Sequence, residues 1–324
     1  MNASSRRGPP APQMRRFASI EAGGTKFNVG IGGPDGSLFD QAQFETRTPA
    51  ETIAAVTCWL DAEVERNGPF SAIGLASFGP VDTDSGSPHW GRLGLTPKLS
   101  WRGVDMIAPF RRYRVPVALD TDVNGAALAE WRWGAGRGHA RVCYLTVGTG
   151  IGGGAVLDGV TLSGRSHPEM GHMFVRRHPD DRFPGACPTH GDCLEGLASG
   201  TAIKARWGDS LSTLGAEHPG YAMIAEYLAQ ACVNIVSTLA PDRLVLGGGV
   251  IGTSGLISDV RRRFDYLTNG YLSEFDAEDI LLAHFSPISG LIGGLAIAER
   301  AVRHAHGSEP PEHLQRWEQQ GLER

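Results

Sequence analysis

The stretch IEAGGTKFNVGI (residues 20–31) decides the fold, because it reads as an apolar strand, a turn containing Gly and Thr, and a second apolar strand. The stretch LTVGTGIGGGAV (residues 145–156) repeats this order. A hairpin turn signal follows each stretch, GPDG at residues 33–36 and LDG at residues 157–159. We interpret the two stretches as an internal duplication in which two β-hairpins begin two similar halves.

Both glycine-rich turns have the composition of an anion site. Without a Cβ, glycine lets several backbone N–H groups point into one concavity that can bind phosphate oxygens. Thr25 and Thr149 can add hydroxyl donors, and Lys26 can add a positive charge. A single turn of this kind is usually only a turn, but two facing turns could hold one triphosphate between two domains.

Strands alternate with helices in the rest of the chain. Buried strands are predicted at residues 72–82, 115–120 and 243–246, and helices at residues 125–133, 221–239 and 291–304. This alternation, repeated twice, predicts an α/β protein with two lobes.

The expected domain organisation follows the duplication. Residues 17–124 and 291–304 form a small N-terminal lobe in this prediction, and residues 125–290 form a large C-terminal lobe. Residues 1–16 are expected to be a disordered tail and residues 305–324 a flexible one, since both are rich in charged residues and proline.

Asp122 lies where a predicted strand ends and a predicted helix begins. In open α/β sheets, ligands bind outside the carboxyl ends of the strands. Nearby N–H groups and the helix dipole would keep this carboxylate ionised, so that it can accept a proton from an attacking hydroxyl. The alternative is a helix N-cap, for which Asp120 and Asp122 both qualify. The neighbouring phosphate turns favour the catalytic base, because phosphoryl transfer needs little beyond alignment, a metal and one base.

A compact group of cysteines and histidines predicts a metal site. His172 precedes the motif C-x2-H-x2-C, which is formed by Cys187, His190 and Cys193. Two cysteines and two histidines at this spacing suit a structural, tetrahedral zinc ion, whose four protein ligands leave no open position. Residues 176–185 are too polar to pack without such an ion in this interpretation. Free thiols and surface histidines are the alternative.

The predicted zinc loop, residues 167–195, also carries two carboxylates. Zinc would bring Glu169 and Glu195 near each other, and paired carboxylates can accept hydrogen bonds from the several hydroxyls of a sugar. Solvated loop acids are an equally simple alternative. His167 and His178 could replace His172 as zinc ligands, each less naturally.

The composition limits the kinds of partner. A net charge near -5 gives no reason to expect nucleic acid or an anionic membrane, and no apolar run approaches the roughly 18 residues that a membrane helix needs. Five cysteines, an odd number without a secretory context, favour a reducing cytoplasm over a disulfide framework. We therefore expect a cytoplasmic protein that binds neither nucleic acid nor membrane.

From about Phe17 to Val302, the chain resembles the ROK family of bacterial sugar kinases, and within it the fructokinase branch. The segment EAGGTK (residues 21–26) is similar to the family's first phosphate loop, GTGIGGG (residues 148–154) to its second, and LGGGV (residues 246–250) to its adenosine segment. The resemblance implies a two-lobed, actin-like and ribonuclease-H-like ATPase fold, built from a duplicated βββαβα unit, with a small zinc-binding loop. It also implies a homodimer that uses Mg-ATP.

The resemblance places functional roles on particular residues. Asp122 falls on the family's catalytic aspartate, and Glu21 could hold Mg2+ through a water molecule. The candidates for contact with the nucleotide are Gly23, Gly24, Thr25, Lys26, Gly148, Thr149, Gly150, Gly152, Gly200, Gly247, Gly248 and Gly249. The candidates for contact with the sugar are Thr121, Glu169, His172 and Glu195.

Three departures from the broad family pattern bear on the substrate. Most members have Asp where Glu21 stands, Asn where Thr121 stands, and a third zinc cysteine where His190 stands. These differences and the segment TPKLSW (residues 96–101) are similar to the fructokinase branch and weaken a glucokinase assignment. The resemblance thus implies phosphorylation of a hexose at its 6-hydroxyl, with D-fructose as the first expectation.

Two other functions stay open. One is a kinase of the same fold for glucose, mannose or an N-acetylhexosamine, and the other is a non-enzymatic sugar sensor. A DNA-binding branch of the family carries an N-terminal helix-turn-helix, which is not expected in the 16 residues that precede Phe17.

Overall fold

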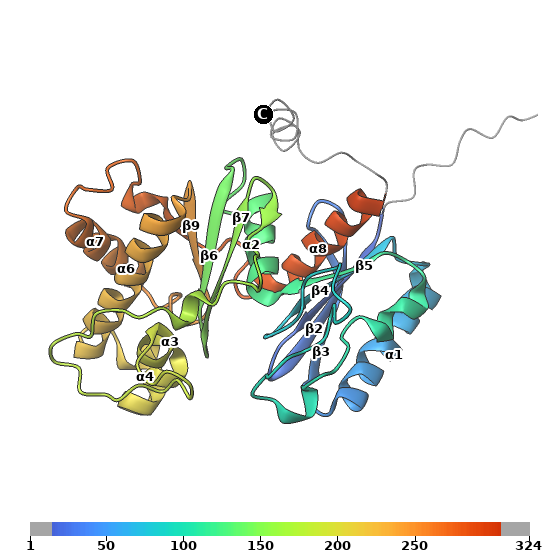
Figure 1. Cartoon of the computed structure of the whole chain (residues 1–324), viewed down its shortest axis with the longest axis horizontal. Helices are drawn as coiled ribbons and strands as arrows, with labels where there is room; N and C mark the ends of the chain where they lie inside the picture. Colours follow the sequence, from blue (N-terminus) through green and yellow to red (C-terminus); the bar gives the residue numbers. More distant parts are fainter. Residues whose placement is uncertain (1–14, 306–324) are drawn as a thin grey trace, which may run out of the picture.

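The structure, a computed structural model, describes residues 15–305. The two predicted tails lie outside the described residues, apart from residues 15, 16 and 305. Figure 1 shows two lobes, each built on its own sheet, with α2 (Asp122–Arg132) and α8 (Ser289–Ala305) between them. The two-lobed α/β prediction is confirmed.

The first lobe contains a five-stranded sheet in the order β3-β2-β1-β4-β5. β1 (Phe17–Ala22) is antiparallel to β2 (Lys26–Gly32), which is antiparallel to β3 (Leu38–Glu45). β1 is parallel to β4 (Ala72–Ser77), and β4 is parallel to β5 (Val117–Thr121). The carboxyl ends of β1, β4 and β5 therefore meet at one edge of the sheet.

The side chains of β1 alternate between two helices that cover opposite faces of this sheet. Ala18 and Ile20 pack in the same cluster as residues of α1 (Pro49–Asn67). Phe17 packs with residues of α8, and the hydroxyl of the intervening Ser19 donates to the carbonyl oxygen of Leu291 in that helix. This alternation of period two is the geometry that an apolar strand buried on both faces requires.

The second lobe repeats the same topology. Its sheet has the order β10-β9-β6-β7-β8, with β6 (Arg141–Val147) antiparallel to β7 (Ile151–Leu157) and parallel to β9 (Arg243–Gly247). β8 (Val160–Thr161) and β10 (Ile280–Leu282) complete its two edges. In both sheets the strands follow the order third, second, first, fourth, fifth, so the predicted duplication is confirmed.

Most of the helices belong to the second lobe. The core helices are α6 (Pro219–Leu239) and α7 (Leu256–Thr268). The shorter segments of this lobe are α3 (Leu194–Ala198), α4 (Gly200–Trp207), α5 (Leu211–Leu214) and the 3-10 turns Met170–His172 and Ala277–Asp279. The 3-10 turns Leu99–Trp101 and Ala108–Tyr113 belong to the first lobe.

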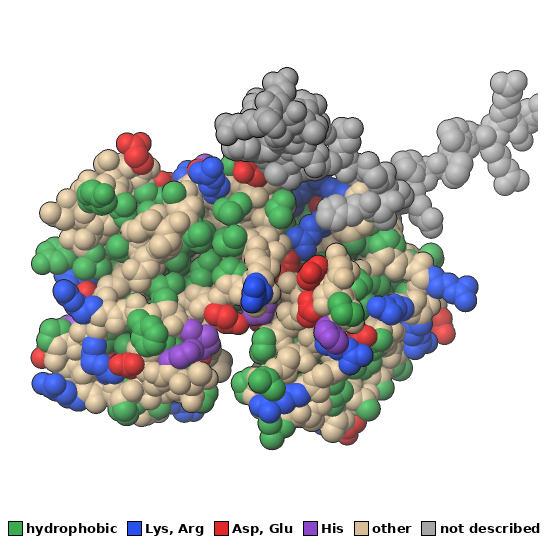
Figure 2. All heavy atoms as spheres, in the orientation of Figure 1, with side chains coloured by type: hydrophobic (Ala, Val, Ile, Leu, Met, Phe, Trp, Pro, Cys, Tyr) green, Lys and Arg blue, Asp and Glu red, His purple; other side chains and the backbone are tan. Residues whose placement is uncertain are grey.

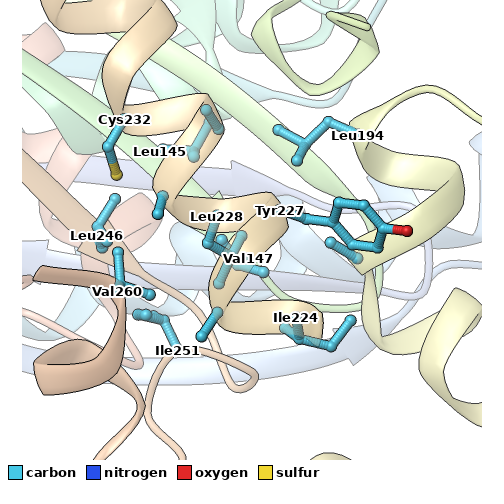
Figure 3. Close-up of a cluster of buried hydrophobic side chains, with 14 of the residues drawn as sticks. Leu145, Val147, Leu194, Ile224, Tyr227, Leu228, Cys232, Leu246, Ile251 and Val260 are labelled. Atoms are coloured by element: carbon cyan, nitrogen blue, oxygen red, sulfur yellow. The ribbon is translucent and has the colours of Figure 1, made fainter. Parts of the chain in front are cut away.

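α6 corrects one expectation from the sequence. By length and composition alone, this 21-residue helix is apolar enough to cross a membrane. Figure 3 shows its side chains Tyr227, Leu228 and Cys232 packed among residues of β6, β9 and α7, and all three are fully buried. The apolar composition is explained by packing in the core of the lobe.

α2 and α8 pass each other closely because both carry glycine at the contact. A Cβ on Gly293 of α8 would overlap the backbone of Gly125 in α2. A Cβ on Gly125 would in turn lie 3.1 Å from that of Ala76 in β4. This close approach fixes the N-terminal turn of α2, which begins at Asp122, beside the end of the first sheet.

Candidate active site between the lobes

A cavity of about 740 Å³ lies between the lobes. Glu21 and Lys26 line it from the first lobe, and Tyr144, Thr146 and Lys204 line it from the second. Figure 2 shows this face hollowed between the lobes, with acidic and histidine side chains near the rim. Among the predicted nucleotide contacts, those that line the cavity are Lys26, Gly148, Thr149, Gly200, Gly248 and Gly249.

The turn between β1 and β2 is held in place through its carbonyl groups. The backbone N–H and the hydroxyl of Thr46 donate to the carbonyl oxygens of Thr25 and Gly23, at 2.9 and 2.8 Å. The N–H of Gly23 donates to Lys26 within the turn, at 3.0 Å. The N–H groups of Gly24 and Thr25 have no acceptor among the described residues. These two donors can therefore bind an anion.

The turn between β6 and β7 is held by a different set of partners. The N–H of Gly200 and the hydroxyl of Thr201 donate to the carbonyl oxygens of Gly148 and Thr149, at 2.7 and 2.8 Å. The N–H of Gly148 donates to Gly150 at 2.9 Å. Within the described part of the chain, the N–H groups of Thr149 and Gly150 donate to no protein acceptor. Each turn thus offers two backbone donors at its tip, as the sequence predicts for a phosphate site.

Several of the other glycines have a packing role of their own. A Cβ on Gly152 would lie 3.0 Å from Val123, and one on Gly247 would overlap the hydroxyl of Tyr144. Gly248 has a φ of +93°, and its Cβ would lie 2.5 Å from the carbonyl oxygen of Val147. A Cβ on Gly200 would lie 2.9 Å from the carbonyl oxygen of Gly148. Close backbone packing therefore accounts for these glycines, and their contact with a nucleotide stays a prediction.

Three parts of the cavity wall carry no sequence signal of their own. Lys204 lies one turn into α4, Thr253 lies in the loop after β9, and Ser289 and Gly290 begin α8. These residues reach the cavity only because the packing of the two halves places them near the two turns. Lys204 and Thr253 each lie four residues after a predicted nucleotide contact, Gly200 and Gly249 respectively, and this spacing could have pointed to them.

The start of α2 corrects the alternative in which an aspartate is the helix cap. Thr121 is the N-cap, because its side-chain oxygen accepts from the N–H of Asn124 at 3.1 Å. Asp122 is the first helical residue, and its Oδ1 accepts from the N–H of Val123 at 2.9 Å. Asp120 is buried and accepts from the guanidinium of Arg300 at 2.9 Å. Neither aspartate is needed as a cap.

Asp122 also differs from the expectation of a carboxylate that is held ionised. Burial raises the pKa of Asp122 to about 7, and the charges of Glu21 and Glu169 add to this shift, whereas the N–H of Val123 opposes it. The loss of hydration thus outweighs the N–H hydrogen bonds on which the sequence prediction in part relied. A carboxyl group with a pKa near the working pH is well suited to accept a proton in the transition state.

Glu21 lies at the end of β1 and faces the same cavity. Burial raises its pKa above the ordinary value, although the side-chain amide of Asn28 donates to Oε2 at 2.7 Å. A Cβ on Gly290 of α8 would overlap Oε1 of Glu21, so the glycine there makes room for this carboxylate.

The four candidates for contact with the sugar have different environments. Thr121 is buried and serves as the cap of α2. Glu195 accepts from the N–H of Ile151 at 3.0 Å, which fixes it beside the second turn. Glu169 has 56% of its side chain exposed and is close enough to raise the pKa of Asp122. His172 directs Nδ1 towards the thiol of Cys193, at 3.5 Å, which leaves Nε2 as the nitrogen that could reach a sugar.

The predicted metal ligands converge. One ligand atom from each of His172, Cys187, His190 and Cys193 lies within 4.8 Å of all the others. Sγ of Cys187 is 3.8 Å from Nδ1 of His172 and 3.7 Å from Nδ1 of His190. A tetrahedral zinc ion, bonded to nitrogen at about 2.0–2.1 Å and to sulfur at about 2.3 Å, separates its ligand atoms by roughly 3.3–3.8 Å. The residues therefore fit zinc, and His167 and His178 are not part of the group.

The polar stretch at residues 176–185 packs by a means that the sequence interpretation did not foresee. Asp181 is buried and accepts from the hydroxyl of Tyr227 at 2.6 Å. Arg206 lies 3.1 Å from the same carboxylate oxygen, and Arg177 pairs with Asp192 at 2.8 Å. These contacts anchor the loop to α4 and α6 independently of any ion, so the statement that it is too polar to pack otherwise was wrong.

The duplicated sheets and the cavity between them define a two-lobed protein of the actin-like ATPase fold. A solved ROK hexokinase from Thermus thermophilus superposes with a TM-score of 0.71 at 27% identity, covering 89% of this chain and 99% of that one. A family model described as the ROK family matches residues 17–301. The chain belongs to the ROK family.

Curated relatives resemble the chain over nearly its whole length. The fructokinase of Zymomonas mobilis is 43% identical over 288 residues, which are 87% of this chain and 96% of that protein. The fructokinase of Pediococcus pentosaceus is 36% identical over 291 residues, which are 89% of this chain and 99% of that protein. The resemblance to the fructokinase branch that the sequence indicated is confirmed.

Proposed function

We propose that this chain is a hexose kinase, which transfers the γ-phosphoryl group of ATP to the 6-hydroxyl of D-fructose. The observation that carries the proposal is Asp122, a half-buried carboxyl group with a pKa of about 7, whose charge interacts with that of Glu21 in the cavity wall. The fructokinase names of relatives at 43% and 36% identity support fructose as the sugar.

The residues have separate roles in this proposal. The free N–H groups of the two turns and the ammonium group of Lys26 bind the phosphates and hold the γ-phosphorus in line with the attacking oxygen. The 6-hydroxyl oxygen forms a bond to that phosphorus while the bond to ADP breaks, and its proton passes to Asp122. When bound, Mg2+ would neutralise the phosphate charge, and Glu21 would hold it through a water molecule.

Zinc is proposed as a structural ion in the cluster of His172, Cys187, His190 and Cys193. Its four ligands leave no open position, so the ion takes no part in the chemistry. It would keep His172, and with it the neighbouring Glu169 and Glu195, on the sugar side of the cavity.

The oligomeric state and the cellular location of the enzyme are also proposals. We infer a homodimer in the cytoplasm, supported by the family resemblance and by the five cysteines, none of which forms a disulfide. Light scattering on the purified protein tests the dimer, because a monomer at micromolar concentration would contradict it.

An ADP-release assay with a panel of hexoses tests the proposed reaction. Fructose should give the highest kcat/KM, and glucose, mannose and N-acetylhexosamines lower values. If another hexose gave the highest value, the proposed substrate would be wrong but the proposed type of reaction would stand. Sugar binding without ADP release for any hexose would instead favour a sensor.

A further inference from the structure

One buried histidine lies in an otherwise exposed loop. Residues 163–166 and Glu169 are exposed, whereas His167 between them has only 6% of its side chain exposed. The sequence suggested this histidine as a substitute zinc ligand, but it lies outside the metal cluster. A polar ring that is buried at this position needs another explanation, because buried polar atoms are nearly always hydrogen-bonded.

The two ring nitrogens of His167 have different surroundings. Nδ1 lies 3.4 Å from Oε1 of Glu169. Nε2 is buried and has no hydrogen-bond partner among the residues that the structure describes. A carboxylate beside Nδ1 favours the tautomer with its proton on Nδ1, which leaves Nε2 as a hydrogen-bond acceptor.

The neighbour on the Nε2 side of the ring is the backbone of the first lobe. A Cβ on Gly79 would lie 3.3 Å from Cε1 and 3.5 Å from Nε2 of His167. Ser77, which ends β4, is in register with Thr121, which ends β5. Gly79 and Asp122 therefore both follow the carboxyl edge of the first sheet, which is where ligands bind in open α/β sheets.

Glu169, which lies beside Nδ1, is also close to Asp122. The charge of Glu169 acts on Asp122, so the two carboxyl groups lie close to each other. His167 is thus connected to Asp122 through Glu169 on one side, and to the carboxyl edge of the first sheet through Gly79 on the other.

We propose that His167 binds the sugar directly. Nε2 accepts a hydrogen bond from one hydroxyl of the hexose, while Nδ1–H holds the carboxylate of Glu169 towards a second hydroxyl. A hydroxyl fits because it can donate to an acceptor nitrogen and still accept from another donor. This assignment rests on the proposed hexose kinase function and adds to it a contact that selects among sugars by the position of their hydroxyls.

Two isosteric substitutions separate the two nitrogens. His167→Asn keeps an amide near the place of Nδ1 and removes Nε2, whereas His167→Gln keeps a polar group near the place of Nε2 and removes Nδ1. We expect His167→Asn to raise the KM and the Kd for fructose by roughly 3- to 10-fold, the effect of one lost hydrogen bond. His167→Gln should retain more of the fructose affinity, and neither variant should change the KM for ATP.

Deoxy sugars then identify the hydroxyl. The wild-type protein should bind the deoxyfructose that lacks the contacted hydroxyl more weakly than fructose, and His167→Asn should cause no further loss with that sugar. Gly79→Ala is an independent second variant, because its methyl group would crowd the Nε2 side of the ring. This variant should weaken the binding of fructose as His167→Asn does. His89→Gln, at an exposed histidine, is the control and should leave every constant unchanged.

The outcomes distinguish this contact from the reaction itself. If the wild-type protein phosphorylates fructose and His167→Asn binds fructose normally by calorimetry without ATP, His167 only supports Glu169 and the proposed contact is wrong. If the wild-type protein phosphorylates no hexose, the kinase proposal fails whatever the variants do. Thermal melts of each variant ensure that a loss of affinity is not a loss of folding.

Discussion

The two halves of the molecule share one topology but differ in the junction between the fifth strand and the following helix, beside the cavity. In the first half, β5 runs directly into α2, and Asp122 is the first residue of the helix. In the second half, residues 283–288 separate β10 from α8, and Ser286, Ser289 and Gly290 at this junction line the cavity. Of these two equivalent helix starts, the first carries a carboxylate and the second carries small residues.

The difference shows how a symmetric scaffold supports an asymmetric reaction. A side chain at Gly290 would displace Glu21, and a second aspartate there would add negative charge beside the bound phosphates. One helix start therefore serves the hydroxyl that attacks, and the other leaves room for the nucleotide and for Glu21. Changes at either start should consequently have different effects.

The largest effect is expected at the first helix start. Asp122→Asn keeps the shape of the side chain and removes the proton acceptor, so kcat should fall by ~10²–10⁴-fold, the usual contribution of a general base. The Kd for fructose should change little. Initial rates and calorimetry measure the two quantities, with Glu65→Gln, at an exposed residue of α1, as the control. Turnover near that of the wild type would mean that Asp122 is not the base.

A smaller effect is expected at the second helix start. Gly290→Ala should displace Glu21 and lower activity at limiting Mg2+ by roughly 10- to 100-fold, the usual cost of disturbing a group that positions a metal. Excess Mg2+ should restore part of the loss, which a titration of rate against Mg2+ would show. Gly164→Ala is the matched control, because a Cβ there meets nothing within 4 Å. An unchanged Mg2+ dependence in Gly290→Ala would argue against the role of Glu21.

The pH dependence should report the same carboxyl group. Asp122 acts when ionised, and burial raises its pKa to about 7. The kcat/KM for the sugar should therefore rise with pH, reaching half its maximum near pH 7, and should be about tenfold below its maximum at pH 6. A rate profile from pH 5.5 to 8.5 tests this expectation, and a flat profile over that range would contradict it.

The sequence was sufficient for the parts of the fold that are local. The hairpins, the apolar strands and the long helix α6 follow from periodicity and turn residues within short windows, and the structure has all of them. The metal ligands were also found, because three of the four lie within seven residues. The pKa of Asp122 could not be found in this way, since burial depends on residues brought together only by folding.

Long-range contacts explain the other misses. Lys204 and Gly290 reach the cavity through the packing of α4 and α8. The contacts of Asp181 with Tyr227 and Arg206, which let residues 176–185 pack without an ion, are likewise formed only by the fold. Such contacts join residues that are distant along the chain, and one sequence carries no local pattern for them.

The metal cluster is a further difference between the halves, because it lies in an insertion between β8 and α6 that the first half lacks between β3 and α1. Chelation should lower the melting temperature and raise the KM for fructose by roughly 3- to 10-fold, since His172 would lose its fixed position. The KM for ATP should change little, because the first turn is braced by Thr46 in the other lobe.

The insertion should nevertheless remain folded without the ion. Asp181 keeps its contacts with Tyr227 and Arg206, so circular dichroism should show no loss of helix on chelation. Cys187→Ser should resemble the chelated protein and should not respond further to the chelator, whereas Cys58→Ser, at an exposed thiol, should respond like the wild type. If chelation removed zinc but left the melting temperature and the KM for fructose unchanged, the ion would not position the sugar side of the cavity.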